Sequence, residues 1–358
     1  MDMSSQRELV RASPAIEITQ LAVQITAALV GAGPALGFGD VNSESAPKNI
    51  AIVVGTSGST GISKEVAFTR RNLIASAQAS NAFIGAELGA QWSLLLPATH
   101  IAAVNVIIRS MEVGTLPIDL RNSIGNYPKV DFTSIVPTQL FRALNSDERL
   151  LSHLQSATAV LVGGAALSSS LRLQAQSAGI KVIETYGMTE TCGGCIYDGQ
   201  ALKGVEFGLT NEGLIKIRGP VVANNYLNAP DLFNINEGWF ISNDLGEIID
   251  GRLRVIGRAD DVIITGGENL SLTAIEATLS VRYPDIECAA FAINDPQWGQ
   301  ALHLAIVGDA NETEISHFLE AAFGQIAKPK GIHRLKSLPL LGIGKVDRVA
   351  LLELVEHE

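Results

Sequence analysis

The sequence predicts an α/β protein with a large N-terminal domain of layered β-sheets and helices, followed by a small α+β C-terminal domain. In the first half of the chain, short apolar runs alternate with helical patterns, which indicates helices packed on a mostly parallel sheet. From about residue 204, short strand-like runs with tight turns replace this alternation of strands and helices. After Arg258 a compact α+β pattern follows. We therefore expect an N-terminal domain over 1–257, a boundary segment over 258–260 and a C-terminal domain over 261–358.

In the first half, each expected element follows from the spacing of apolar residues. Residues 8–30 have helical spacing, and the glycines of 31–40 are expected to end that helix in a loop. The apolar run "IAIVV" (50–54) is expected to be a strand that enters a glycine-rich loop. The other expected elements are helices over 70–88 and 168–179, and strands over 92–97, 134–136, 159–162 and 181–184.

The second half contains shorter elements. The segment "IIDGRLRVI" (248–256) predicts a hairpin, because Asp-Gly is a preferred two-residue turn between alternating strands. The remaining expected elements are strands in 261–267, 288–293 and 301–308, and helices over 272–281 and 312–324.

Composition narrows the class of protein. The chain has 358 residues, 47% hydrophobic and 18% charged, with a net charge of −11. This charge argues against extensive nucleic-acid binding, which needs a basic face. The apolar stretches are too short for a membrane span, and the N-terminus lacks a signal-peptide pattern. The three cysteines do not form a disulfide framework, so we expect a cytoplasmic protein.

The segment "TSGSTGISKEV" (56–66) follows the apolar strand and combines glycines, hydroxyl residues and Lys64. Glycines let several backbone N–H groups converge on an anion, so this composition indicates a phosphate-binding loop. It is not a Walker A motif, because Lys64 lies three residues after Gly61 rather than one. An ordinary surface turn remains the alternative if this segment is taken alone.

Six motifs occur in order along the chain: "TSGSTGISKEV" (56–66), "VGGAAL" (162–167), "ETYGMTET" (184–191), "GWFISNDLG" (238–246), "GRADDVIITGGEN" (257–269) and "GIGKVDR" (342–348). Together they resemble the adenylate-forming superfamily, which includes acyl- and aryl-CoA synthetases, nonribosomal adenylation domains and luciferases. The resemblance implies an enzyme that uses ATP and Mg²⁺ to convert a carboxylate to an acyl-adenylate, which coenzyme A then attacks.

The resemblance assigns residues to ATP and to the first reaction step. Lys345 would bridge the acid and the α-phosphate, Thr189 would meet the α-phosphate, and Glu190 would ligate Mg²⁺. Asp244 would accept the ribose hydroxyls, although it also suits an ordinary turn. The implied ATP-binding residues are Thr56, Ser57, Gly58, Ser59, Thr60, Gly61, Lys64, Gly163, Gly164, Ala165, Tyr186, Gly187, Met188, Thr189, Asp244, Arg258 and Lys345.

The second reaction step needs other groups at the same carbonyl. Members of the superfamily rotate the C-terminal domain between the steps, and the resemblance places the hinge at Asp260. It implies that Gly266, Gly267 and Glu268 then line the channel for coenzyme A.

The segment "LPATHIAAVNVIIRSMEVG" (96–114) resembles the bacterial o-succinylbenzoate–CoA ligases of menaquinone biosynthesis. Such a substrate has two carboxylates, and Arg109 is the candidate that binds the one that is not activated. A structural ion pair with Glu112 is the alternative for Arg109. His100 would line the acyl pocket, or be a buried structural histidine. Gly187 and Thr191 complete the implied substrate site.

The sequence departs from the usual motifs of the superfamily at three places. Ser63 replaces the usual proline of the phosphate loop, and Asn243 precedes the aspartate expected at the ribose. The segment "LSLT" (270–273) replaces an aromatic–proline pair. "CGGC" (192–195) has metal-site spacing but lacks a second ligand pair nearby, and "GAGPALG" (31–37) fails the dinucleotide-binding pattern.

The sequence is compatible with three classes of function. The first is an o-succinylbenzoate–CoA ligase, and the second is an aryl-CoA synthetase for another acid or an adenylation enzyme that loads a carrier protein. The third is a non-catalytic nucleotide-binding protein. The expected partners are a small carboxylate, ATP and coenzyme A, without nucleic acid or a membrane span, and a homodimer is compatible with the resemblance.

Overall fold

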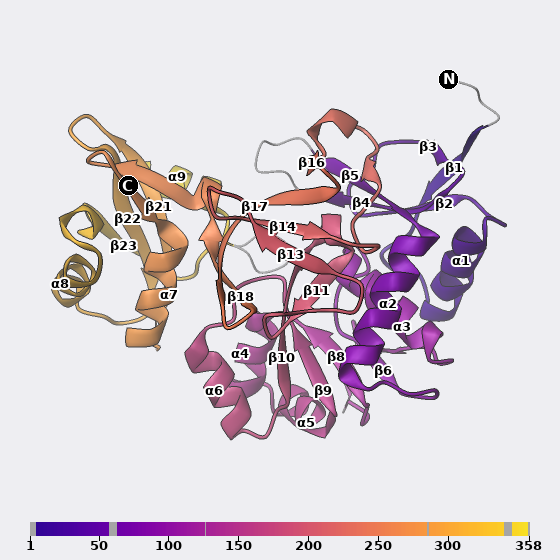
Figure 1. The fold of residues 1–358 in the computed structure, drawn as a ribbon. Coiled ribbons are helices and arrows are strands. Elements are labelled where there is room, and N and C mark those ends of the chain that lie inside the picture. Colours follow the sequence, from indigo (N-terminus) through magenta and orange to yellow (C-terminus); the bar gives the residue numbers. More distant parts are fainter. Residues whose placement is uncertain (1–4, 57–62, 126, 285, 340–345, 357–358) are drawn as a thin grey trace.

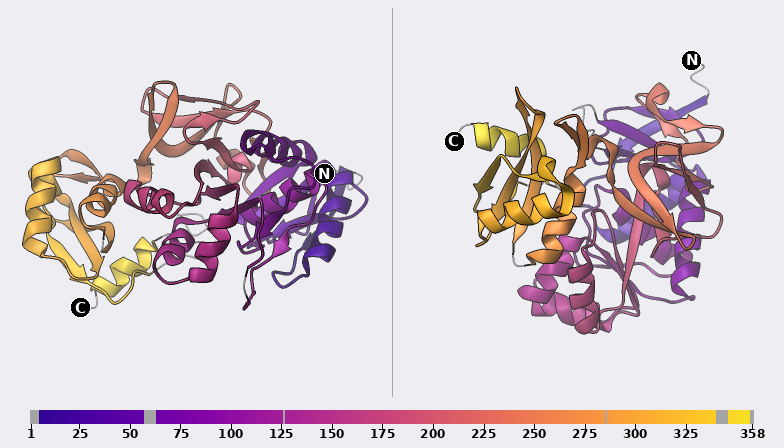
Figure 2. Two further views of the ribbon diagram at one scale, coloured as in Figure 1. Left: turned by 90° about the horizontal axis from the view of Figure 1, so that it is seen from below. Right: turned by 60° about the vertical axis from the view of Figure 1, so that its left-hand side comes forward.

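The protein consists of stacked β-sheets with helices between and around them, and a smaller α+β part at one side (Figure 1). The computed structural model describes residues 5–56, 63–125, 127–284, 286–339 and 346–356. Two further views show that the orange and yellow segments, after about residue 260, lie beside the rest of the chain (Figure 2).

The first sheet is built around β4, in which residues 50–54 are all buried, as the apolar run predicts. The described strands of this sheet are ordered β15–β5–β4–β2–β1–β3. Strand β4 is parallel to β2 and antiparallel to β5. The bounds are β1 Gln6–Arg11, β2 Ala35–Phe38, β3 Ser45–Pro47, β4 Ile50–Thr56, β5 Lys64–Thr69 and β15 Asn225–Tyr226.

The second sheet contains the expected parallel strands. Its described strands are ordered β12–β11–β10–β9–β8–β6–β7, and β7, β6, β8, β9 and β10 pair in parallel. Strands β11 and β12 continue the sheet in antiparallel pairing. The bounds are β6 Trp92–Leu94, β7 Ile118–Asp119, β8 Phe132–Ile135, β9 Ala159–Val162, β10 Val182–Met188, β11 Gly193–Tyr197 and β12 Gln200–Ala201.

Two helices, α2 and α3, pack between these sheets. Helix α2 begins after Thr69, which forms a capping box with Asn72, and ends at Gly85, where φ is 70°. Glycine suits this left-handed position because it has no Cβ. The helices of the larger part are α1 Ile18–Val30, α2 Arg70–Ile84, α3 Ile101–Glu112, α4 Pro137–Asn145, α5 Glu148–Ser156 and α6 Ser169–Ser177.

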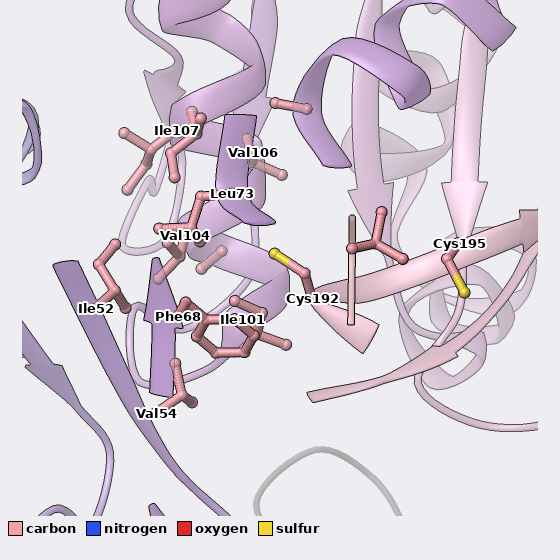
Figure 3. Packing of buried hydrophobic residues seen from close by; sticks show 14 of the residues in the cluster. Ile52, Val54, Phe68, Leu73, Ile101, Val104, Val106, Ile107, Cys192 and Cys195 are labelled. Carbon is pink, nitrogen blue, oxygen red and sulfur yellow. The ribbon is translucent and has the colours of Figure 1, made fainter. Parts of the chain in front are cut away.

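The main hydrophobic core joins both sheets through these two helices. Figure 3 shows Ile52 and Phe68 of the first sheet facing Leu73 of α2 and Val104 of α3, with Cys192 near them. Because close-packed interiors resist shifts of one layer against another, this core holds the strand ends of the two sheets in one arrangement.

The third sheet has the predicted hairpin. Strands β17 and β18 are joined at Asp250 and Gly251, whose φ angles of 49° and 74° are those of a tight Asp-Gly turn. The bounds are β13 Glu206–Leu209, β14 Leu214–Arg218, β16 Ile235–Asn236, β17 Trp239–Ile249 and β18 Arg252–Arg258.

The fourth sheet belongs to the smaller part, which follows about residue 260. This part has a hydrophobic core of its own, whose members come from the segment 263–332. Helices α7 and α8 contribute to that core, and α9 contributes to a second cluster on the sheet. The bounds are β19 Val262–Thr265, β20 Glu268–Ser271, β21 Glu287–Asp295, β22 Gly299–Val307, β23 Gly331–Arg334, α7 Leu272–Arg282, α8 Glu312–Phe323 and α9 Arg348–Glu356.

Two predictions near the N-terminus were wrong. The expected helix over 8–30 is helical only as α1, because its first residues belong to β1, and the expected loop over 31–40 contains β2. Leu9 and Ala35 pair directly as neighbours in the first sheet. Pro14 explains the break, since proline disrupts a helix interior and separates β1 from α1.

We predict that Gly55→Ala lowers the midpoint of thermal unfolding by about 3–10 °C, because overpacking of this kind costs about 1–3 kcal/mol. A Cβ at Gly55 would lie 2.1 Å from the backbone oxygen of Asp40. Gly125→Ala is the matched control, since no described atom lies within 4 Å of its Cβ position. Equal midpoints for the two variants would contradict the prediction.

Candidate active site

The predicted phosphate loop lies between two paired strands. Ser57, Gly58, Ser59, Thr60 and Gly61 are outside the described residues, but both flanks of the loop are defined. Thr56 ends β4 and pairs with Lys64 at the start of β5, and the Thr56 hydroxyl donates to the Lys64 carbonyl at 3.3 Å. The two described flanks of the loop therefore lie side by side at the end of one strand pair.

Three residues predicted to bind the nucleotide meet where strands of the second and third sheets approach each other. The Tyr186 hydroxyl donates to Asp244 Oδ2 at 2.8 Å, and Arg258 Nη1 lies 3.7 Å from Asp244 Oδ1. Burial and the nearby Asp244 carboxylate raise the pKa of Tyr186, so its phenol stays protonated and donates. The antiparallel register of β17 and β18 places Asp244 opposite Arg258.

The predicted adenine-side turn, Gly163–Ala165, follows β9 next to β10. A Cβ at Gly163 would lie 2.2 Å from the Thr185 hydroxyl oxygen, and Gly164 has a φ of 84°. Both positions therefore require glycine. The turn lies at the carboxyl ends of parallel strands, where open α/β sheets bind ligands.

The segment after Tyr186 makes a sharp turn. A Cβ at Gly187 would lie 2.1 Å from the Gly193 carbonyl oxygen, at a bulge between β10 and β11. Met188 ends β10, and Thr189–Thr191 form one 3-10 turn. Thr191 is fully buried, and its hydroxyl bonds to the Met188 N–H and the Gly193 carbonyl. Within the described structure, the Thr191 side chain thus stabilises the turn itself.

Glu190 lies on this turn and reaches the first sheet. Its Oε1 accepts a hydrogen bond of 2.6 Å from the Tyr226 hydroxyl, and its carbonyl accepts one of 2.8 Å from the Ala223 N–H. The Lys64 ammonium lies 5.0 Å from the centre of the Tyr226 ring. Tyr226 was missed by the sequence reasoning, because β15 has two residues and pairs with a strand far earlier in the chain.

His100 and Arg109 lie on α3, as the sequence predicts. His100 is the N-cap residue and is partly exposed. Arg109 is 4% exposed, and its Nη2 donates to the Tyr197 hydroxyl at 3.1 Å. Glu112 accepts a hydrogen bond from Gln78 at 2.8 Å instead of pairing with Arg109.

The Arg109 guanidinium lies in the core. Among the described residues no carboxylate is within 4.0 Å of it, and its Nε has no hydrogen-bond partner there. It lies 5.7 Å from the centre of the Trp92 ring. A buried cation is unfavourable unless an anion or several donors and acceptors compensate its lost hydration.

The smaller part contributes the remaining predicted residues. Gly266 and Gly267, with φ angles of 60° and 84°, form the turn between β19 and β20, and Glu268 begins β20. Lys345 and the side chain of Asp260 are outside the described residues. Arg348, shortly after Lys345, pairs with Glu276 at 2.8 Å and with Asp261 at 3.4 Å.

The "CGGC" cysteines are part of the core. Cys192 and Cys195 are fully buried, and burial raises the pKa of each thiol to about 12. Metal ligation and redox exchange need the thiolate, which burial disfavours at neutral pH. Among the described helices, none is long and apolar enough to cross a membrane.

Comparison with known proteins identifies one matching enzyme family and related ligases. The model of a family described as "AMP-binding enzyme" matches residues 5–226. A probable 2-succinylbenzoate–CoA ligase of Mycobacterium tuberculosis is 38% identical over 325 residues, covering 85% of this chain and 84% of that protein. The 2-succinylbenzoate–CoA ligase of Staphylococcus epidermidis is 32% identical, covering 84% of this chain and 69% of that protein.

A solved structure shares the fold. The o-succinylbenzoate CoA synthetase (MenE) of Bacillus subtilis, in complex with the acyl-adenylate intermediate OSB-AMP, has a TM-score of 0.75. It is 22% identical, and the likeness covers 96% of this chain and 82% of that one.

The matched family model includes both flanks of the phosphate loop, the turn at Glu190 and the tyrosine that contacts it. Since that model spans more than half of the sequence and a relative with 38% identity covers most of it, this chain belongs to the AMP-binding enzyme family.

Proposed function

We propose that the protein is an ATP-dependent acid–thiol ligase that converts 2-succinylbenzoate to its coenzyme A thioester through an acyl-adenylate. The arrangement around Glu190 carries this proposal. The Tyr186–Asp244–Arg258 group and the Lys64–Tyr226–Glu190 group flank the same turn, Gly187–Thr191. The names of the two ligase relatives support the choice of acid.

In the first step, a carboxylate oxygen of the acid attacks the α-phosphorus of ATP. The bond between that phosphorus and the bridging oxygen breaks, and pyrophosphate leaves. Because charge builds up on phosphate oxygens, placed cations and donors supply most of the catalysis. Lys64 and the loop amides would hold the β- and γ-phosphates, and Asp244 would accept the ribose hydroxyls. Thr189 would contact the α-phosphate, and Lys345 would bridge it to the acid.

The donors at Glu190 suit Mg²⁺. This ion is typically bound through one or two carboxylates, with substrate phosphates and water as its other ligands. The described residues contain no group of three metal-ligating side chains. Glu190, which contacts Tyr226 beside Lys64, would supply the single carboxylate. When bound, Mg²⁺ supplies charge neutralisation at the phosphates, while Glu190 would hold it from the protein side.

In the second step, the thiolate sulfur of coenzyme A attacks the acyl carbonyl and AMP leaves. The part of the chain after residue 260 would move between the steps, with the hinge at 258–260. Its separate hydrophobic core supports movement as a unit. The turn at Gly266–Glu268 would then line the thiol channel.

Arg109 favours an acid with a second carboxylate. The guanidinium is buried and lacks a carboxylate partner within the described part of the chain. A second carboxylate would supply that partner, and the energy of this pairing would select the substrate. His100, at the start of the same helix, would lie nearer the activated carboxylate.

The direct test is ATP–pyrophosphate exchange over a panel of acids, followed by mass spectrometry of the thioester. We expect exchange with 2-succinylbenzoate and formation of its coenzyme A thioester. Exchange confined to monocarboxylic benzoates would assign another acid. Nucleotide binding without exchange for any acid would leave a non-catalytic protein and refute the proposal.

Arg109→Ala is expected to raise the KM for 2-succinylbenzoate by about tenfold or more, because a charge-assisted hydrogen bond contributes about 1.5–3 kcal/mol. The KM for ATP should change less than about twofold, and Arg109→Lys should recover part of the loss. Glu112→Gln is the control and should change neither constant. Equal increases in both constants would mean that Arg109 has only a structural role.

Lys345→Ala is expected to slow adenylation by about 10²-fold or more, because it removes a cation from the developing charge. Thiolation of a supplied acyl-adenylate should stay within about threefold of the unmodified protein. The exposed Lys336, changed to alanine, provides the control. Loss of both half-reactions to the same extent would exclude the proposed role.

A further inference from the structure

The segment Ala223–Asn228 belongs to none of the motifs, yet it contacts two residues of the proposed site. It runs antiparallel to β5, with Tyr226 opposite Val66. The Ala223 N–H donates to the Glu190 carbonyl at 2.8 Å, and the Leu227 N–H donates to the Glu65 carbonyl at 2.7 Å. One short segment thus connects the exit of the phosphate loop with the turn that carries Glu190.

Tyr226 makes the closest contact with Glu190. Its side chain is 3% exposed and packs edge-on against Phe233, with the ring centres 5.0 Å apart. This packing fixes the ring, and the hydroxyl donates to Glu190 Oε1 at 2.6 Å. The carboxylate oxygen is the acceptor of this hydrogen bond and the phenol is its donor.

Lys64 is held beside the same ring. Asn228 bonds to the backbone on both sides of Lys64, through the Ser63 carbonyl at 2.7 Å and the Glu65 N–H at 3.0 Å. The ammonium lies over the Tyr226 ring, 5.0 Å from its centre. In the described part of the chain, no carboxylate is within 4.0 Å of this ammonium.

The next residue fastens the other face of β5. Glu65 is 1% exposed, and its Oε1 accepts hydrogen bonds from the N–H groups of Asn42 at 2.6 Å and Ser43 at 3.1 Å. The Ser43 hydroxyl donates to the other oxygen of Glu65. The backbone at Lys64 is therefore fixed from two directions, and the position of the ammonium depends mainly on the ring beneath it.

We infer that Tyr226 is a positioning residue that keeps Lys64 and Glu190 apart and orients the Glu190 carboxylate toward Mg²⁺. The ammonium lies over the ring and one carboxylate oxygen accepts from its hydroxyl, so the ring serves as a spacer that both charged groups contact. Without this spacer, the two opposite charges would pair with each other rather than with phosphate and metal. The inference rests on the proposed function, since it assigns Glu190 to the metal and Lys64 to the phosphates.

The test measures binding of α,β-methylene-ATP by calorimetry, with and without Mg²⁺. For the unmodified protein, Mg²⁺ should tighten binding. Tyr226→Phe keeps the ring but loses the hydroxyl, and should reduce that tightening by about tenfold, the usual effect of removing a group that orients a metal ligand. Binding without Mg²⁺ should change less than about twofold.

Two further variants sharpen the result. Tyr226→Leu also removes the spacer, so it should weaken binding without Mg²⁺ as well, because Lys64 can then pair with Glu190. The double variant Tyr226→Phe with Glu190→Gln should lose no more tightening than Glu190→Gln alone, since the hydroxyl acts through that carboxylate. Tyr127→Phe removes a phenol hydroxyl elsewhere in the larger part of the protein. Mg²⁺ should tighten nucleotide binding by this variant as much as by the unmodified protein.

The outcomes separate the inference from the proposed function. If the unmodified protein binds the nucleotide analogue under neither condition, the proposed function fails. If Mg²⁺ tightens binding equally in Tyr226→Phe and the unmodified protein, the inference fails while the function stands. Equal losses in Tyr127→Phe and Tyr226→Phe would also overturn the inference.

Discussion

The hydrogen bond between Tyr226 and Glu190 joins the two large sheets at the point where the proposed chemistry takes place. Tyr226 lies at the edge of the first sheet, and Glu190 lies on the turn that follows the last parallel strand of the second sheet. The shared core of α2 and α3 sets the separation of these sheets. A hydrogen bond of 2.6 Å is satisfied over a narrow range of distance, so this contact constrains the layers to one register.

Asparagines of the two helices between the sheets bond to backbone carbonyls near the same turn. Asn105 of α3 donates to the Cys192 carbonyl at 2.6 Å, and Asn72 of α2 donates to the Pro220 and Val222 carbonyls at 2.8 Å each. These amides give each polar backbone group a partner inside an otherwise apolar layer. The turn at Glu190 is thus fixed from α2, α3 and β15.

The net charge of the chain explains why anion binding depends on individually placed cations. With a net charge of −11, the protein does not attract anions generally, so an anionic substrate must be met by individually placed groups. Lys64 lies over an aromatic ring, Arg258 lies beside Asp244, and Arg109 is buried next to Tyr197. Each cation has a different environment, and in the proposed function Lys64 would meet phosphate groups and Arg109 the second carboxylate.

The sequence by itself determined the elements whose signal is local. The buried run of β4 and the Asp250–Gly251 hairpin follow from spacing and residue type. The resemblance of the motifs to a known superfamily singled out Tyr186, Asp244 and Glu190. Only the tertiary structure decided that residues 6–11 form a strand and that Tyr226 donates a hydrogen bond to Glu190. It also decided that Glu112 bonds to Gln78 rather than pairing with Arg109. These depend on pairing and burial between distant segments, and nothing in the local pattern specifies which partner a strand edge or a buried side chain will meet.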